Sequence, residues 1–393
     1  MLAADSLMSE PRSRLADTIA MVILFLMATG AVMVFSAGAN LGHEFDLRHF
    51  YDFPGLRQIM FFPIAVVVLF LASVPNYRFW RFRSHWYTCP AVWLLVIAFA
   101  LLIAVLVPSL GTAVNQARRW LRIPLGPVSI SFQPSELAKW MMVFFLAGVC
   151  SKIGPDLKLY WRRFLPLCLL IGLVCGPIVV EDFGTAAFIA LISFTILLVA
   201  GVKWWHVLTL LPIGTIGVIA ALIQAPHRVQ RLAAFLHPEW FGESVAYQAN
   251  QSLIAIGSGG VWGKGLGQGI SKYGHLPEDT TDFIFAILGE ELGVVGTLGV
   301  IALFIFFVIL GVVVVTRCRD PFGRLLAAGI VLTIGVQAAL NIGVVTVVLP
   351  TKGIPLPFVS AGGTSMLLSS AAVGVLLNIA ARAGPDCLDV SSD

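Results

Sequence analysis

Long apolar runs dominate the chain and are separated by short polar segments. A hydrocarbon core about 30 Å thick is crossed by roughly 20 apolar residues in a helix. Ten runs of about this length are present, at 18–38, 57–75, 88–108, 134–150, 164–180, 184–200, 204–223, 285–316, 325–349 and 364–381. The runs are continuously apolar and do not alternate, and lipid cannot satisfy free backbone groups, so we expect helices and not the strands of a barrel. The pattern predicts an all-α polytopic membrane protein with about ten transmembrane helices.

The composition of the chain supports this prediction. Of its 393 residues, 58% are hydrophobic and only 12% are charged, whereas a soluble domain carries about 25% charged residues. The net charge of +4 is spread thinly and indicates no nucleic-acid partner. The six cysteines form no C-x-x-C pair, and the seven histidines show no metal-ligand spacing. These features argue against a soluble enzyme, a nucleic-acid binder and a protein held together by disulfides or zinc.

The distribution of Lys and Arg predicts the orientation. With the N-terminus in the cytoplasm, inside segments carry fourteen Lys and Arg and outside segments ten. Four of those ten lie in one long loop, where the positive-inside rule is weak. We therefore expect a cytoplasmic tail at 1–17, one membrane domain over 18–382 and a second cytoplasmic tail at 383–393.

One connection is much longer than the others. Residues 224–284, between the seventh and eighth predicted spans, form an external loop of the kind that is usually functional or disordered. Within it, seven of the thirteen residues from 257 to 269 are Gly. This stretch follows no predicted strand and lacks the G-K-[ST] ending of a nucleotide-binding loop. It is either a tight external turn or a backbone that approaches the phosphates or sugars of a ligand.

Charged residues collect at the external ends of the predicted spans, and charges near or within spans indicate function by default. Glu136 and Lys139 share one helix face at i,i+3 spacing, so they form either a structural ion pair or part of a site. In the ninth span, Gln337 and Asn341 are expected to make hydrogen bonds between helices. The other charges of this external group are Arg118, Arg119, Glu181, Asp182, Asp282, Glu290, Glu291 and Lys352.

The eighth span sets the height of its acids. If Arg317 marks its cytoplasmic end, twenty residues reach the outer edge of the hydrocarbon near residue 297. Glu290 and Glu291 then lie about 10 Å above that edge, at the level of lipid headgroups, as substrate contacts or as ordinary solvated acids. Asp282 lies further out.

A carboxylate and several cations at headgroup height suit a lipid-linked anionic substrate. If the substrate is a lipid pyrophosphate that carries sugar, a base must take a proton from the attacking hydroxyl. Positive charge must also stabilise the departing pyrophosphate. Asp282 is the candidate base, and the candidate stabilising cations are Arg118, Arg119, Lys139 and Lys352. An external acid cluster could also bind Mg²⁺ or Mn²⁺, although the sequence shows no dedicated ligand set.

Six segments resemble the signature motifs of the SEDS family (shape, elongation, division and sporulation). They run in family order from the fourth span to the tenth: Ala117–Trp120 (ARRW), Phe132–Lys139 (FQPSELAK), Asp182–Thr185 (DFGT), Tyr247–Gly260, Leu276–Gly293 and Leu349–Phe358 (LPTKGIPLPF).

The resemblance implies a ten-span bacterial peptidoglycan glycosyltransferase that polymerises lipid II on the outer face of the cytoplasmic membrane. It implies that Asp282, in the T-D-F-I-F motif, is the essential aspartate. It also implies a class B penicillin-binding protein, a transpeptidase, as partner, alongside other division proteins and membrane lipids. The substrate-binding residues expected from both arguments are Arg118, Arg119, Glu136, Lys139, Glu290, Glu291, Lys352 and Ser360.

Two branches of the family differ in short motifs. The division branch (FtsW-like) usually reads P-T-K-G and I-G-E-E, and the elongation branch (RodA-like) more often reads P-V-x-G and A-E-E. This chain has P-T-K-G at 350–353 and L-G-E-E at 288–291, which favours the division branch. The family's S-Y-G-G-S reads S-A-G-G-T at 360–364, which loses an aromatic residue. A lipid II flippase, an elongation enzyme and a scaffold for the transpeptidase remain alternatives.

Overall fold

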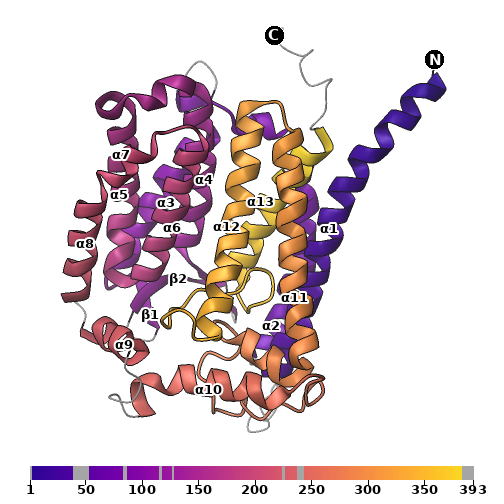
Figure 1. Ribbon diagram of the computed structural model, residues 1–393, viewed down its shortest axis with the longest axis vertical. Coiled ribbons are helices and arrows are strands. Elements are labelled where there is room, and N and C mark those ends of the chain that lie inside the picture. The colour runs from indigo at the N-terminus through magenta and orange to yellow at the C-terminus, as the bar shows by residue number, and fades with distance from the viewer. Residues whose placement is uncertain are drawn as a thin grey trace.

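A bundle of membrane-length helices forms the body of the protein. The computed structural model describes residues 2–38, 53–82, 86–114, 117–125, 128–223, 226–236 and 243–382. The start of α1 and the end of α13 lie at one end of the bundle, and the strands, α9 and α10 lie at the other (Figure 1). The predicted tail at 383–393 lies outside the described residues, whereas the predicted tail at 1–17 is largely a continuation of the first helix.

The helices match the predicted spans closely. Seven of those described are long and apolar enough to cross a membrane, and the other three predicted spans fall on shorter apolar helices at Pro90–Leu106, Phe183–Val199 and Trp204–Ala220. The α-helices are α1 (Leu2–Gly38), α2 (Pro54–Ser73), α3 (Pro90–Leu106), α4 (Pro134–Ile153), α5 (Leu165–Glu181), α6 (Phe183–Val199), α7 (Trp204–Leu208), α8 (Leu211–Ile223), α9 (Pro226–Leu236), α10 (Glu243–Gly259), α11 (Ile284–Arg317), α12 (Pro321–Val345) and α13 (Gly363–Arg382). Short turns η2 (Tyr77–Trp80), η3 (Trp86–Thr88), η4 (Gly154–Lys158) and η5 (Tyr160–Phe164) connect some of them.

Proline and aspartate set several helix starts. A proline opens α2, α3, α4 and α12, where its missing N–H leaves no donor unsatisfied. The predicted start of the fourth span at Pro134 is thus confirmed. Asp182 caps α6 and Asp320 caps α12, because each carboxylate accepts a hydrogen bond from a backbone N–H of the first turn. The cap on α6 places Asp182 directly beside the arginines described below.

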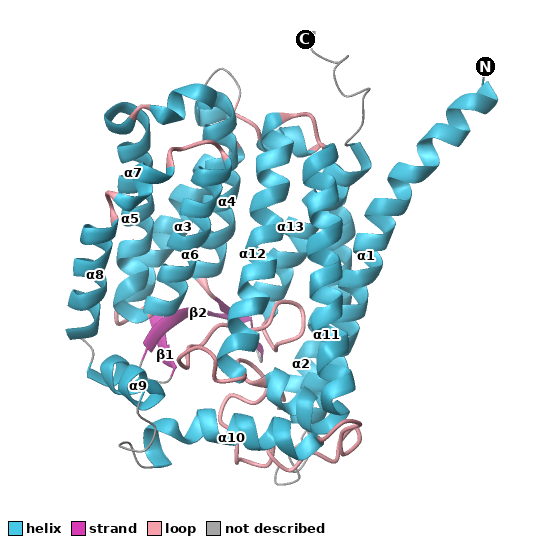
Figure 2. Ribbon diagram, in the orientation of Figure 1, coloured by secondary structure: helices cyan, strands magenta, loops and turns pink. Residues whose placement is uncertain are grey.

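A three-stranded antiparallel sheet follows α3 and was not predicted. It consists of β1 (Gly111–Val114), β2 (Ala117–Leu125) and β3 (Val128–Phe132), in the order β1-β2-β3. The segment lies between two apolar runs and carries no long hydrophobic pattern of its own, so an all-α prediction missed it. Figure 2 shows the strands at the end of the bundle where α9 and α10 lie. The sheet places the predicted site residues Arg118 and Arg119 on its central strand.

The predicted external loop contains two helices, α9 and α10, which pack at the end of the bundle opposite the start of α1. The Gly-rich stretch begins at the end of α10, and beyond Gly259 it runs alongside the first turns of α11. Backbone N–H groups of Lys264 and Gly265 donate to the carbonyls of Glu290 and Glu291, each at 3.0 Å. The close approach of this glycine backbone is therefore to the protein's own helix.

The helix α11 is broken where the Gly-rich stretch crosses it. Gly293 has φ +68° and ψ −165°, which is not helical, and Val294 and Val295 donate to the carbonyls of Gly260 and Val261. A Cβ on Gly263 would lie 2.2 Å from the carbonyl oxygen of Glu291. Only glycine permits the positive φ of Gly293 and the close approach of Gly263 to α11.

The core of the bundle is formed by α4, α12 and α13. In an apolar 18-residue segment of each helix, 61% of the residues of α4, 67% of those of α12 and 72% of those of α13 are buried. The corresponding shares are 22% for α2 and 28% for α11. The central helices therefore carry the polar residues that most need protein partners, because nothing in the hydrocarbon could satisfy them.

Candidate functional site

Asp282 lies in a short segment that precedes α11 and is fixed by hydrogen bonds from two other elements. The side-chain amide of Asn341, on α12, donates to the carbonyl oxygen of Asp282 at 2.8 Å. The Ser360 hydroxyl donates to the carbonyl oxygen of Thr281, and the Ala361 N–H donates to that of Thr280 at 2.9 Å. The backbone around Asp282 is thus fixed from both sides, and the side chain remains partly buried.

The carboxylate of Asp282 faces the loop between α12 and α13 and an arginine of β2. A Cβ built on Gly353 would lie 2.9 Å from Oδ2 of Asp282 and 3.9 Å from Nη1 of Arg119. Burial, reinforced by the carboxylates of Glu278 and Asp182, raises the pKa of Asp282 to about 7. A carboxyl group with such a pKa is half-ionised near neutral pH, as a general base requires.

Arg119 is the cation best placed beside Asp282. Its Nε and Nη2 donate to the carbonyl oxygen of Glu181 at 3.2 and 3.1 Å, and its Nη1 lies 3.3 Å from Oδ2 of Asp182. Arg118 donates its backbone N–H to the Glu181 carboxylate at 2.8 Å. The turn between α5 and α6 therefore positions both arginines of β2 that the sequence singled out.

Lys352 completes the positive side of this cluster. Its Nζ lies 5.4 Å from the centre of the Phe183 ring at the start of α6. Burial lowers its pKa, and the nearby carboxylate of Asp182 opposes that effect. One region thus contains Asp282, Arg118, Arg119 and Lys352. It is built from β2, the start of α6, the segment before α11 and the loop after α12.

The predicted pair on α4 is present and deeply buried. Lys139 Nζ lies 2.8 Å from Oε2 of Glu136 and also donates to Oε1 of Gln337 at 3.0 Å. Glu136 is 5% and Lys139 2% exposed. This geometry is that of a structural ion pair tied to α12.

Glu290 and Glu291 are neither solvated nor open to headgroups. Glu291 accepts hydrogen bonds from Lys272 at 2.9 Å and from the Ser36 hydroxyl of α1 at 2.7 Å. Glu290 pairs with Lys264 at 2.7 Å and is 1% exposed. The alternative of ordinary solvated acids is wrong, because the chain after α10 folds over both acids and pairs Glu290 with Lys264 and Glu291 with Lys272.

Sequence reasoning placed Ser360 among the substrate contacts, and the structure gives it a backbone role. It is 5% exposed, and its hydroxyl bridges the N–H of Leu356 and the carbonyl of Thr281. Two neighbours of Asp282 were missed. Arg231 on α9 lowers the pKa of Asp282, and burial raises the pKa of Asp279 to about 6. No sequence signal marked Arg231, which lay in a predicted loop.

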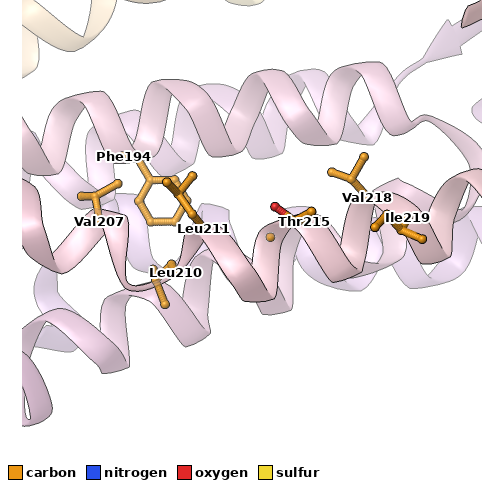
Figure 3. A pocket seen from close by; sticks show the side chains of 8 residues that line it. Phe194, Val207, Leu210, Leu211, Thr215, Val218 and Ile219 are labelled. Atoms are coloured by element: carbon orange, nitrogen blue, oxygen red, sulfur yellow. The ribbon is translucent and has the colours of Figure 1, made fainter.

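Two cavities among the described residues differ in chemistry. One of about 20 Å³ lies beside Arg118, Arg119 and Asp182. The other, of about 370 Å³, is an apolar groove between α6 and α7–α8, and Figure 3 shows Phe194, Leu211 and Thr215 among its lining side chains. In the described part of the chain, no three His, Cys, Asp or Glu residues group as metal ligands, so these side chains do not fit a Mg²⁺ or Mn²⁺ site of their own.

Residues 16–384 match the FtsW/RodA/SpoVE family model, described as a cell cycle protein. The chain belongs to this family. The resemblance to SEDS proteins is confirmed, and the described structure has the mostly helical, polytopic fold expected of a FtsW/RodA/SpoVE membrane protein.

Relatives within the FtsW/RodA/SpoVE family match over nearly the whole chain. A probable peptidoglycan glycosyltransferase FtsW from Coxiella burnetii is 36% identical over 361 residues, which cover 91% of this chain and 94% of that protein. Stage V sporulation protein E from Bacillus subtilis is 37% identical over 366 residues, with 91% and 94% covered.

Two solved structures share the fold at 24% identity. One is from a study of how a peptidoglycan synthase complex coordinates polymerization and crosslinking, with a TM-score of 0.68 and 92% of this chain and 96% of that chain covered. The other is the rod shape determining protein RodA of Thermus thermophilus, with a TM-score of 0.61 and 93% and 96% covered.

Proposed function

We propose that this protein is a peptidoglycan glycosyltransferase that polymerises lipid II during cell division, with Asp282 as the general base. Its relatives at 34–38% identity include several proteins named probable peptidoglycan glycosyltransferase FtsW. The observation that carries the catalytic assignment is the carboxylate of Asp282, whose pKa is raised to about 7 beside the guanidinium of Arg119.

The reaction is an inverting displacement at the anomeric carbon of the donor sugar. Asp282 takes the proton of the attacking acceptor hydroxyl while the new C–O bond forms. The bond between the donor carbon and the pyrophosphate oxygen breaks, and undecaprenyl pyrophosphate leaves with the electron pair. Arg119, Arg118 and Lys352 stabilise its negative charge.

Polymerisation of labelled lipid II by the purified full-length protein tests this proposal. Asp282→Asn keeps the shape of the side chain and removes the base, so we expect a loss of 10²–10⁴-fold in rate, about the contribution of one positioned base. Asp156→Asn, an exposed aspartate in η4, is the control and should retain polymerisation. Lipid translocation in liposomes without polymer would instead support a flippase, and full activity of Asp282→Asn would contradict the assignment of the base.

The proposed site faces the outside of the cell, with both termini in the cytoplasm. Lys158, in the η4 turn that follows the end of α4, and Trp262, just after α10, are both exposed. We expect a membrane-impermeant maleimide added to intact spheroplasts to label Trp262→Cys and to leave Lys158→Cys unlabelled until the membrane is opened. The reverse labelling would place Asp282 in the cytoplasm and contradict the proposal.

A class B penicillin-binding protein is the proposed partner. A neighbour in fold comes from a peptidoglycan synthase complex in which polymerization and crosslinking are coordinated. We expect a cognate transpeptidase to copurify with this protein and to increase its rate of polymerisation. An unchanged rate with the bound transpeptidase would contradict an activating role.

A further inference from the structure

Two amides of α12 lie one helical turn apart and reach both loops of the proposed site. The Asn341 side chain donates to the carbonyl oxygen of Asp282 at 2.8 Å and to that of Ile354 at 2.7 Å. The Gln337 side chain donates to the carbonyl oxygen of Pro355 at 2.9 Å. Adjacent carbonyls of the loop between α12 and α13 are therefore tied to adjacent turns of one central helix.

The contacts of Asn341 leave little freedom to its side chain. A side-chain amide nitrogen has two N–H donors, and both are used here on backbone carbonyls, which can only accept. Asn341 is 1% exposed, and its Oδ1 is buried with no hydrogen-bond partner among the described residues. An unpartnered buried oxygen is costly. The side chain thus leaves its Oδ1 without a partner, while its two N–H groups join Asp282 to the opposite loop.

The loop that Asn341 and Gln337 fix forms a wall of the site. It carries Gly353, which lies against the Asp282 carboxylate, and Lys352, which lies beside the start of α6. On the other side, Gln337 accepts a hydrogen bond from Lys139, which pairs with Glu136. Hydrogen bonds therefore link the ion pair of α4 through Gln337 to the backbone of this loop, and Asn341 links the same loop to the backbone carbonyl of Asp282.

We propose that Asn341 is a positioning residue for Asp282, and that Gln337 extends this support to the loop that carries Lys352 and Gly353. The inference rests on the proposed function, since it assigns a role in that same reaction. Neither amide touches the substrate. Asn341 fixes the Asp282 backbone relative to the opposite wall, and the Glu136–Lys139 pair fixes Gln337.

The predicted effect is on the rate and on the ionisation of the base. A displacement of about 1 Å in a reacting group can cost on the order of 10²-fold in rate. The Asp282 carboxylate is faced by Glu278 on its own segment, Asp182 on α6, Arg119 on β2 and Arg231 on α9. Freeing the segment admits water, which favours the charged carboxylate and moves its titration to lower pH.

Asn341→Leu in the full-length protein tests the proposal, because leucine has the branched shape of asparagine and cannot donate. We expect kcat for lipid II polymerisation to fall about 10²-fold, KM to stay unchanged, and the acid limb of the pH profile of kcat to move to lower pH. Gln337→Met, which spares Asn341, should give a smaller fall in kcat with the same direction of pH change. It keeps the proposal testable if Asn341→Leu does not fold.

The matched control is Asn378→Leu. Asn378 is a buried asparagine on α13 that donates to the carbonyl of Ser73 at 2.7 Å and accepts from the N–H of Tyr77 at 3.0 Å, near the other end of the bundle. This variant should lose thermal stability and keep the kcat and pH profile of the folded protein. A merely structural role for Asn341 would give it the same result.

The inference is overturned if both α12 variants keep the wild-type kcat and acid limb, or if Asn341→Leu behaves as Asn378→Leu does. Asp282→Asn measured in parallel separates this failure from that of the proposed function. If Asp282→Asn is inactive while the α12 variants are unaffected, only the inference fails. If Asp282→Asn polymerises lipid II normally, the assignment of the base fails, and the inference fails with it.

Discussion

Gly353 lies directly against the carboxylate of Asp282. A Cβ at Gly353 would come within 2.9 Å of Oδ2 of Asp282, closer than such contacts normally allow. The two residues are 71 positions apart in the sequence, and the loop of Gly353 is tied to α12, which also fixes the backbone of Asp282. The loop backbone is therefore one wall of the site.

Gly353→Ala should impair polymerisation without unfolding the protein. The added methyl group must displace the carboxylate of Asp282, and such a displacement can cost on the order of 10²-fold in rate. Gly362→Ala is the matched control in the same region, because its Cβ would meet only Ser365 at an ordinary distance of 3.6 Å. Equal rates for the two variants would show that Gly353 does not confine Asp282.

The rate of polymerisation should rise with pH through neutrality. A carboxyl group acts as a base only when it is ionised, and the pKa of Asp282 is raised to about 7. Below that pKa the ionised fraction falls tenfold for each pH unit, so kcat should fall in the same way from pH 7 to pH 5. A profile that is flat over this range would contradict the role of Asp282.

Charge substitutions near Asp282 should move this acid limb in opposite directions. Glu278 raises the pKa of Asp282 and Arg119 lowers it. Glu278→Gln should therefore move the limb to lower pH, and Arg119→Gln should move it to higher pH, whatever each does to the maximum rate. Kinetics of both variants from pH 5 to pH 9 would check this, and shifts of the same sign would count against the assignment.

Removing Lys272 should destabilise the protein more than removing Lys264. Lys272→Met leaves the carboxylate of Glu291 buried without its cation, which costs about 3–5 kcal/mol. Lys264 has a side chain that is 30% exposed, and its partner Glu290 keeps two backbone N–H donors, from Ile270 and Ser271. Thermal unfolding in detergent would compare the two variants, and an equal loss would mean that burial of Lys272 has no added effect.

Two glycines of the Gly-rich stretch form a matched pair for testing its packing on α11. Gly263 and Gly267 have nearly the same φ, +80° and +81°, so alanine pays a similar conformational cost at both. At Gly263 the new Cβ would also lie 2.2 Å from the carbonyl of Glu291, whereas at Gly267 it meets nothing within 4 Å. Gly263→Ala should lower the unfolding temperature well beyond Gly267→Ala, and similar temperatures would contradict the close approach.

The hydrophobic pattern predicted the helices well because each apolar run must become a helix in lipid. The start of α4 at Pro134 and the pairing of Glu136 with Lys139 also followed from local spacing. The sheet was not predictable in this way. Its strands lie between two spans, and their pairing, such as Leu121 with Phe132, depends on contacts that no local pattern encodes.

The site was also predicted only in part, because local patterns in the sequence do not reveal contacts between distant segments. Grouping charges by the external ends of spans correctly brought Arg119 and Lys352 to the region of Asp282. It did not reveal that Glu290 and Glu291 are buried, because height along a helix carries no information on the lysines, some twenty residues earlier, that fold back onto them. Asn341 was expected to bond between helices, and only the structure shows that its partner is the Asp282 carbonyl.

The unequal lengths of the helices have a consequence for the surrounding lipid. α3 and α6 have 17 residues each, whereas α11 continues without a break from Val294 to Arg317, which is 24 residues. A 17-residue helix spans about 26 Å, some 4 Å less than a typical hydrocarbon core. The bilayer next to α3 and α6 must therefore thin locally to avoid hydrophobic mismatch, while the bilayer next to the longer α11 need not. The lipid layer around the protein is therefore expected to be thinner next to α3 and α6 than next to α11.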